Sequence, residues 1–245
     1  RQKHSLDPKR RQARQPRGFR HNNMKTPEQR KQASIAILQE HGVPYIDWLP
    51  VIEDASEARV RSAEEIARRA IACLITIQAA FDRYNDEYTP SVADKYQHIL
   101  ARYQLNDALT AEENAIYNGA GGEAEITKMT WKYEAYWTLL WALGIIPELD
   151  YPAHTIDCEA ACQAVFDHQD FASFMTTVRL RPIEDILDQA DLIYRYHWAC
   201  VDARINGREM PGGLLESVVM ERHAGLNWLI GAYDSDDWDD VPVHT

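Results

Sequence analysis

The sequence predicts an all-α protein: a single globular domain of roughly eight helices packed around a Trp-rich buried helix. Three observations predict this class. Capping signals of the Ser/Thr-x-x-Glu/Gln type recur along the chain, apolar residues between them repeat at helical spacing, and no run alternates strands with helices or repeats at a fixed period. With 245 residues, of which 45% are hydrophobic, the chain can bury one sizeable core.

The first half of the chain contains four predicted helices, each opened by a cap. The capping pairs are Thr26 with Gln29, Ser62 with Glu65, Ser91 with Asp94, and Thr110 with Glu113. The first helix is expected to end near His41, before Gly42. Residues 42–54 hold too much proline for a helix, so we expect them to lie extended across the surface with Trp48 and Leu49 docked.

The second half contains four more predicted helices and one ambiguous segment. The helices are the Trp-rich helix that ends at Gly144, then those over residues 158–167, 182–204 and 214–231. Residues 171–178 fit either a helical turn or a lone strand.

Charge is distributed unevenly along the chain. Residues 1–25 hold nine Lys or Arg side chains and one acid, a net charge of +8, and because the whole chain carries −12 the remaining residues carry −20. Residues 1–25 have one aromatic side chain and no periodic pattern, so we predict a disordered basic extension.

"MKTPEQRKQ", from Met24, is typical of a bacterial N-terminus, so residues 1–23 are interpreted as an over-long gene start or a vector remnant. Residues 26–245 are then the helical domain, which ends in an acidic tail.

Composition also indicates the cellular location of the protein and the class of molecule it binds. No run of about 18 apolar residues predicts a membrane span, and no secretory signal is recognised. Four cysteines are too few for a disulfide scaffold, so we expect reduced thiols and a cytoplasmic protein. The negative charge of residues 26–245 disfavours binding to nucleic acid, which only the basic residues 1–25 would attract.

Several familiar motifs are weighed and set aside. The loop with Gly119, Gly121 and Gly122 precedes a helix, as phosphate-binding loops do, but it lacks the Lys-Ser/Thr of a P-loop. Neither a G-x-S-x-G elbow nor an H-E-x-x-H helix occurs, and no cofactor is assigned. Cys200 lies one turn after His197, yet His197 continues an apolar stripe, which favours a core histidine.

Metal binding has two weak candidates. Zinc-type ligands occur at His154, Cys158, Cys162 and His168, but their spacing departs from known zinc motifs, and the alanines between the cysteines favour a packing face. The tail "DSDDWDD" lacks the glycine and the distal glutamate of a calcium loop, so a solvated tail with Trp238 docked is expected. We therefore assign no metal site.

Two charged residues occur on apolar helix faces: Glu134, among the aromatic residues of "WKYEAYWTLLWALG", and Arg222 in the last helix. A buried charge without a partner costs several kcal/mol, so each is predicted to pair with an opposite charge. Arg222 is the simplest partner for Glu134, with Arg61 and Arg69 as alternatives. The other interpretation of Glu134 is a catalytic carboxylate.

Two functional hypotheses follow. The first is a protein-binding or inhibitory module, for example an immunity protein that neutralises a toxin, whose acidic surface binds a basic protein. The second is a hydrolase-like small-molecule enzyme with a site near Glu134, Arg222, His223 and Asn227, the last two being one turn apart. A deep cleft where these side chains converge would favour the enzyme, and a closed core would favour the binder.

Six stretches together resemble one bacterial family, the domain-of-unknown-function family 4272. They are "HGVPYIDWLPVIED", "RSAEEIARRAIA", "WKYEAYWTLLWALG", "YHWACVDARING", "ERHAGLNWLIG" and the terminal "WDDV". The resemblance covers about residues 30–241, and the order of the blocks makes it fairly specific. The chain differs from the family pattern in the basic extension before Met24 and in ending "PVHT" after "WDDV". The family implies no established activity, so no catalytic residue follows from it.

Overall fold

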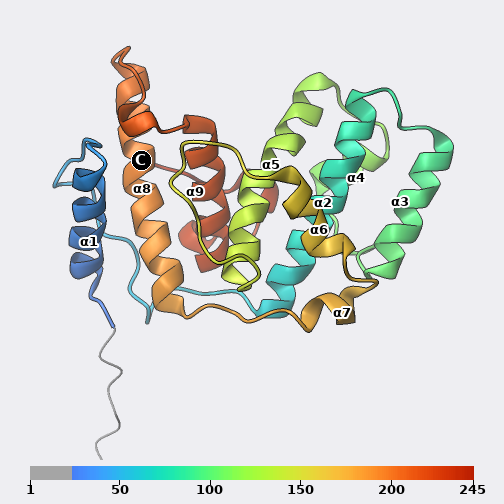
Figure 1. Cartoon of the computed structure of the whole chain (residues 1–245), viewed down its shortest axis with the longest axis horizontal. Helices are drawn as coiled ribbons and strands as arrows, with labels where there is room; N and C mark the ends of the chain where they lie inside the picture. Colours follow the sequence, from blue (N-terminus) through green and yellow to red (C-terminus); the bar gives the residue numbers. More distant parts are fainter. Residues whose placement is uncertain (1–23) are drawn as a thin grey trace, which may run out of the picture.

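The helices α1, α8, α9, α5 and α2 stand side by side in a row in the computed structural model, which describes residues 24–245 (Figure 1). In chain order the helices are α1 (Pro27–Glu40), α2 (Ala63–Tyr84), α3 (Pro90–Arg102), α4 (Ala111–Tyr117), α5 (Glu123–Ala142), α6 (Cys158–Phe166), α7 (Phe171–Met175), α8 (Ile183–Ile205) and α9 (Glu216–Ile230). Three single 3-10 turns follow α8 or α9: η1 (Pro211–Gly213), η2 (Ala232–Asp234) and η3 (Trp238–Asp240). The predicted extension at residues 1–23 lies outside the described residues.

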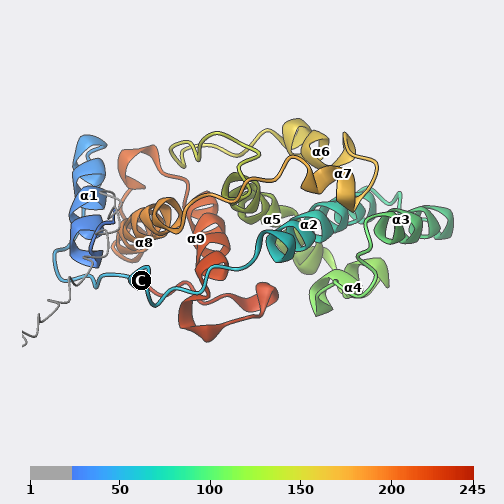
Figure 2. The ribbon, with the colours of Figure 1, turned by 90° about the horizontal axis from the view of Figure 1, so that it is seen from below.

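The chain is all-α and forms one compact domain, as predicted, since residues 24–245 contain no strand. Helices α3 and α4 pack against α2 at one end of the row, and α6 lies across α2 and α5 (Figure 2). The ambiguous residues 171–178 contain the short helix α7. Among the described helices, none is long and apolar enough to cross a membrane.

The capping signals place most helix starts correctly. Thr26 and Thr110 form complete capping boxes, in which the hydroxyl and the third helical residue's side chain exchange hydrogen bonds with the backbone. Ser62 accepts the hydrogen bond from Glu65 N, but the Glu65 carboxylate pairs with Arg61 instead of returning it.

The third helix begins earlier than predicted. Thr89 caps α3 by accepting a hydrogen bond from Val92 N, and Pro90 is the first helical residue. Ser91, the predicted cap, is therefore inside the first turn. Thr89 and Pro90 set the start of α3 because Thr89 supplies a capping oxygen and the fixed φ of Pro90 suits the first helical position.

The segment between α1 and α2 contains no helix, but turns at residues 47–49 and 55–57 interrupt the predicted extended chain, and only one of its two predicted anchors is docked. Leu49 is buried, whereas Trp48 is 77% exposed, so the docking predicted for Trp48 was wrong. Lys31 donates to the Asp47 carbonyl, and Arg195 donates to the Leu49 carbonyl. Trp48 and Leu49 lie in a turn, closed by a hydrogen bond of 3.5 Å from Leu49 N to the Ile46 carbonyl, so the chain reverses there with Leu49 inside and Trp48 outside.

The acidic tail is anchored by one aromatic residue. Trp238 is buried, as predicted, and its ring meets that of Trp228 edge-on, with ring centroids 5.3 Å apart. Lys132 Nζ lies 5.4 Å from the Trp238 ring centre, a distance at which a cation attracts an aromatic face. The tail therefore packs on α5 and α9 through Trp238.

Helices α5 and α9 approach each other closely at Gly225. A Cβ atom on Gly225 would lie 2.2 Å from Thr138 Oγ1 and 3.0 Å from the Ala135 carbonyl oxygen. No side chain larger than hydrogen fits there without movement of α5 or α9.

We expect Gly225→Ala to lower the free energy of unfolding by about 1–3 kcal/mol through overpacking, although alanine normally gains roughly 1 kcal/mol over glycine within a helix. Urea unfolding measures the change. The double variant Gly225→Ala/Thr138→Ala should recover part of the loss, because it removes the 2.2 Å contact. A Gly225→Ala protein as stable as the wild type would show that the two helices do not meet there.

Candidate functional site

The four predicted site residues do not converge on one cavity. Glu134 lies on α5, and the other three lie on α9. Arg222 lines one cavity, whereas His223 and Asn227 line another, and Glu134 lines neither. Successive residues of a helix point about 100° apart, so Arg222 and His223 necessarily face different sides.

Glu134 is 2% exposed, but it is not paired with an arginine. Its Oε1 accepts a hydrogen bond of 2.9 Å from Ile156 N, and its Oε2 has no partner among the described residues. Burial raises the pKa of the Glu134 carboxyl, while the Ile156 N–H, Arg222 and His154 act to lower it. The described residues place no cation within 4.0 Å of Glu134, so the predicted ion pair was wrong.

The predicted partners of Glu134 bind elsewhere. Arg222 donates to the carbonyl of Asp150, Arg69 forms a buried ion pair with Glu113, and Arg61 binds carbonyls and carboxylates near the tail. Arg222 thus acts on Glu134 only through the electric field between them.

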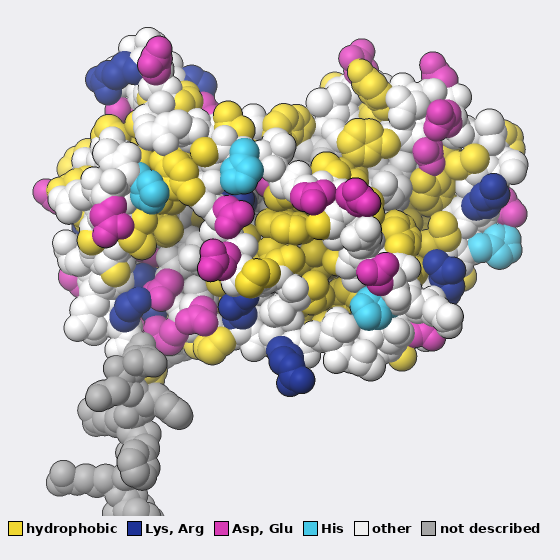
Figure 3. All heavy atoms as spheres, viewed as in Figure 1, with side chains coloured by type: hydrophobic (Ala, Val, Ile, Leu, Met, Phe, Trp, Pro, Cys, Tyr) yellow, Lys and Arg dark blue, Asp and Glu magenta, His cyan; other side chains and the backbone are white. Residues whose placement is uncertain are grey.

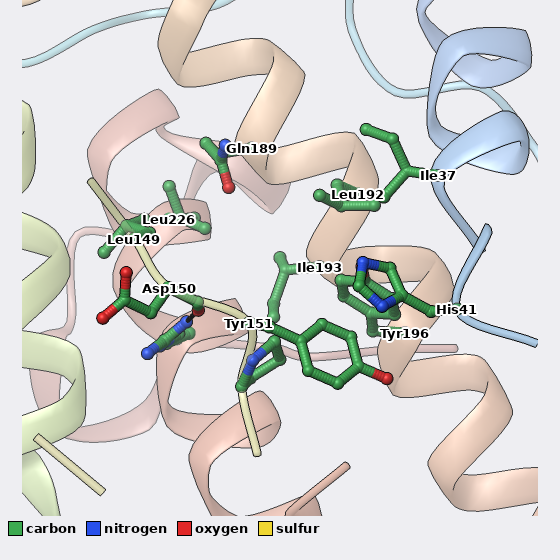
Figure 4. Close-up of a pocket in the computed structure, with 12 residues that line it drawn as sticks. Ile37, His41, Leu149, Asp150, Tyr151, Gln189, Leu192, Ile193, Tyr196 and Leu226 are labelled. Carbon is green, nitrogen blue, oxygen red and sulfur yellow. Dashed lines mark hydrogen bonds between the residues drawn. The ribbon is translucent and has the colours of Figure 1, made fainter. Parts of the chain in front are cut away.

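Arg222 lines a partly open cavity of about 170 Å³ between α1, α8, α9 and the loop after α5 (Figure 4). We call it the Arg222 cavity. Its apolar wall consists of Leu149, Leu192, Ile193 and Leu226. The rings of His41 and Tyr151, stacked with centroids 4.2 Å apart, also line the cavity, and the Tyr151 hydroxyl donates to the Gly212 carbonyl.

The second cavity is an open groove of about 410 Å³ on another side of α9. We call it the acidic groove; its lining includes Val51, Glu53, Glu57, Tyr194 and Tyr233, with His223 and Asn227. It lies where the connector between α1 and α2 runs beside the tail, which are cyan and red in Figure 2. The tail is held there by a hydrogen bond of 2.8 Å from Asn227 Nδ2 to the Pro242 carbonyl.

Backbone strain marks the edge of the acidic groove. Tyr233 and Asp234 have φ angles of +60° and +52°, in the left-handed region that residues with a side chain seldom adopt. Strain of this kind persists only where the surrounding structure imposes it, and it gathers at functional sites.

His223 and His197 form a buried pair on the α9 side of the acidic groove. Their Nδ1 atoms lie 2.8 Å apart, so one ring donates a proton to the other. Burial lowers the pKa of His197 to about 4, and burial together with His197 and His244 lowers the pKa of His223 to about 3. Both rings are therefore neutral near pH 7. His197 is a satisfied core histidine, as predicted.

Cys200, one turn after His197, is not a reactive cysteine. Burial raises the pKa of its thiol to about 12, which excludes a reactive thiolate.

The weaker candidates do not form sites. Within residues 24–245, no three His, Cys, Asp or Glu side chains come close enough together to hold a metal ion. The four candidate zinc ligands have other surroundings: Cys162 Sγ lies 3.5 Å from the Tyr133 hydroxyl, His168 Nδ1 lies 3.1 Å from Ser173 Oγ, and His154 and Cys158 are exposed.

The glycine loop before α5 binds the guanidinium group of Arg83. The carbonyls of Ala120 and Gly121 accept hydrogen bonds of 2.7 and 3.0 Å from Arg83, and the Gly122 N–H donates to the Glu125 carboxylate. A phosphate would need backbone N–H groups such as that of Gly122, which is already engaged.

Sequence reasoning missed Glu53, Glu57, Tyr194 and Tyr233 as groove residues. They come from three distant segments, and only their joint position reveals a site. The one available signal was that residues 42–54 are too rich in proline for a helix and were expected to run along the surface.

The histidine pair should make the protein sensitive to acid. A histidine whose folded pKa lies below its unfolded value of about 6.5 stabilises the fold above that pH, and the contribution is lost as pH falls toward the folded pKa. We expect the free energy of unfolding to fall by roughly 4–6 kcal/mol between pH 6.5 and 4 from this pair. Urea unfolding over that range measures it. His223→Gln should reduce the dependence, whereas His98→Gln, at an exposed position on α3, should not; equal behaviour of the two variants would contradict the assignment.

Comparison with known proteins identifies a family. A family model described as a domain of unknown function, DUF4272, matches residues 30–241. This match spans most of the chain and confirms the resemblance carried by the six sequence blocks. No curated protein and no solved structure matches the chain. The chain belongs to the DUF4272 family.

Proposed function

We propose that the protein is a cytosolic protein-binding module, and that its acidic groove receives a lysine or arginine side chain of a basic protein partner. One observation carries the proposal: two carboxylates, Glu53 and Glu57, line an open groove together with two tyrosine rings. Neither carboxylate forms an ion pair within the described residues. An arrangement of acids and aromatic faces attracts an organic cation.

The buried side of the groove is compatible with a cation. His223 is the ionisable group there, and because burial lowers its pKa to about 3 it carries no charge that would repel an ammonium or guanidinium group. Arg59, near the rim, pairs with Asp234 at 3.8 Å in solvent, where such a pair is weak and easily rearranged.

Exposed apolar side chains extend the groove into a larger binding surface. Trp48 is two residues before the groove residue Pro50, and it is the most exposed of the large apolar side chains of the described chain. Val51 and Tyr233 are also exposed. Trp and Tyr are the residues that most often carry binding energy in protein interfaces.

The charge of the whole body favours a basic partner. Residues 26–245 carry a net charge of −20, which speeds encounter with a positive protein and repels nucleic acid. On the face shown in Figure 3, acidic side chains also surround an apolar area near the centre. An immunity-type inhibitor of a nucleic-acid-binding toxin is one protein class that would fit these properties.

The alternative, a hydrolase-like enzyme that uses Glu134, Arg222, His223 and Asn227, has less support. Arg222 lines one cavity, His223 and Asn227 line another and Glu134 lines neither, so no single substrate atom would meet all four.

The test is affinity capture from native cells with the wild-type chain and two charge-matched variants. We expect Glu53→Gln/Glu57→Gln to lose a basic partner that the wild type captures, with an affinity reduced about tenfold or more. Glu123→Gln/Glu148→Gln, which neutralises two exposed acids elsewhere, should retain it. Association should slow markedly between about 0.01 and 0.15 M salt, where the screening length falls from about 30 to 8 Å.

Three outcomes would contradict the proposal. They are capture of no partner by the wild type, equal capture by both double variants, and association that is independent of salt.

A further inference from the structure

We infer that the Arg222 cavity binds a small organic anion, a carboxylate of about two to four carbon atoms. This site is separate from the acidic groove and does not depend on the proposed protein-binding function. The inference rests on the unused donors of a buried arginine, on the shape of the cavity, and on the position of the neighbouring acids.

Arg222 has more hydrogen-bond donors than the protein satisfies. A guanidinium group carries five N–H donors and stays protonated in proteins. The side chain is 4% exposed, and its only hydrogen bond to a described residue runs from Nη1 to the Asp150 carbonyl. The Nε atom is buried without a partner. Because unsatisfied buried donors are costly, an acceptor in the cavity would be strongly favoured.

A carboxylate is the acceptor that suits a guanidinium group best, because its two oxygens can accept two parallel N–H bonds. The cavity of about 170 Å³ suits a ligand of a few heavy atoms, since one liquid water occupies about 30 Å³. Leu192, Ile193 and Leu226 would contact a short hydrocarbon chain. Figure 4 shows Gln189 from α8 and His41 at the end of α1 beside the same space, where each offers a further polar contact.

Nearby acids leave room for the anion. Figure 4 shows the Asp150 carboxylate directed away from Ile193 and His41. Glu134 does not line the cavity, and its Oε1 is engaged by Ile156 N. The charges of Glu134 and of Asp150, which lines the cavity, both act on Arg222 and oppose a bound anion. Neutralising Glu134 should therefore strengthen anion binding.

The experiment titrates the full chain with sodium propanoate, with propanamide as a neutral molecule of the same shape, and with sodium chloride as the salt control. Melting temperature and calorimetry report binding up to about 20 mM, which covers the weak affinity of so small a ligand. Propanoate should give a saturable rise in melting temperature, and the two controls should not.

Variants with opposite expected effects make the test specific. Gln189→Glu places a like charge in the cavity and should weaken propanoate binding about tenfold or more. Gln97→Glu, at an exposed position on α3, has the same chemistry and should leave it unchanged. Glu134→Gln keeps an acceptor for Ile156 N and should bind propanoate several-fold more tightly. These three variants retain Arg222, so they do not leave a buried charge stranded.

Some results would overturn the inference. Stabilisation by propanamide equal to that by propanoate would contradict it, and so would the lack of a saturable change with propanoate. Equal binding by Gln189→Glu and Gln97→Glu would place the anion outside the Arg222 cavity. Failure of any of these tests leaves the acidic groove untouched, because its own variants lie on another side of α9.

Discussion

Helix α9 is enclosed by protein on nearly every side, and the rest of the structure depends on that enclosure. Gly225 lets α5 approach on one side, and α8 packs on another. A polar side chain on such a helix has little access to solvent, so its contacts are limited to the protein groups in the direction it points. Glu221 therefore faces Lys132 of α5, Arg222 faces the Asp150 carbonyl, and His223 faces His197 of α8. The separation of the two cavities follows from this geometry.

Arginine side chains stabilise the connections between helices mainly by donating to carbonyls. Arg181 binds the carbonyls of Trp141 and Ile146, at the end of α5 and just after it, and Arg195 binds those of Leu49 and Pro50 in the connector between α1 and α2. Backbone carbonyls left unpaired at helix ends and in loops need donors, and the guanidinium group supplies several from one side chain. This use of arginine explains how the body packs while its net charge remains strongly negative.

Local chemistry made much of the fold predictable from sequence, and long-range geometry accounts for most of the remainder. The caps at Thr26, Ser62 and Thr110 rest on hydrogen bonds three residues apart, so the sequence contains both partners. The partner of Arg222 was not predictable in this way, because a search among opposite charges overlooks carbonyls, which every residue carries. Trp48 shows a third limit: aromatic character indicates burial, but the bonds that turn Leu49 inward come from Lys31 and Arg195, far away in the chain.

The packing of α9 between α5 and α8 also favours two cavities that act independently. Coupling between two sites requires an element with two arrangements that both ligands bias, and proximity alone does not supply one. Helix α9 is held between α5 and α8, and the close approach at Gly225 leaves little space for it to shift. A ligand beside Arg222 would satisfy donors without moving the helix, and a cation in the acidic groove would meet a neutral His223 already bonded to His197. The arrangement therefore favours two independent sites on a rigid support over an allosteric pair.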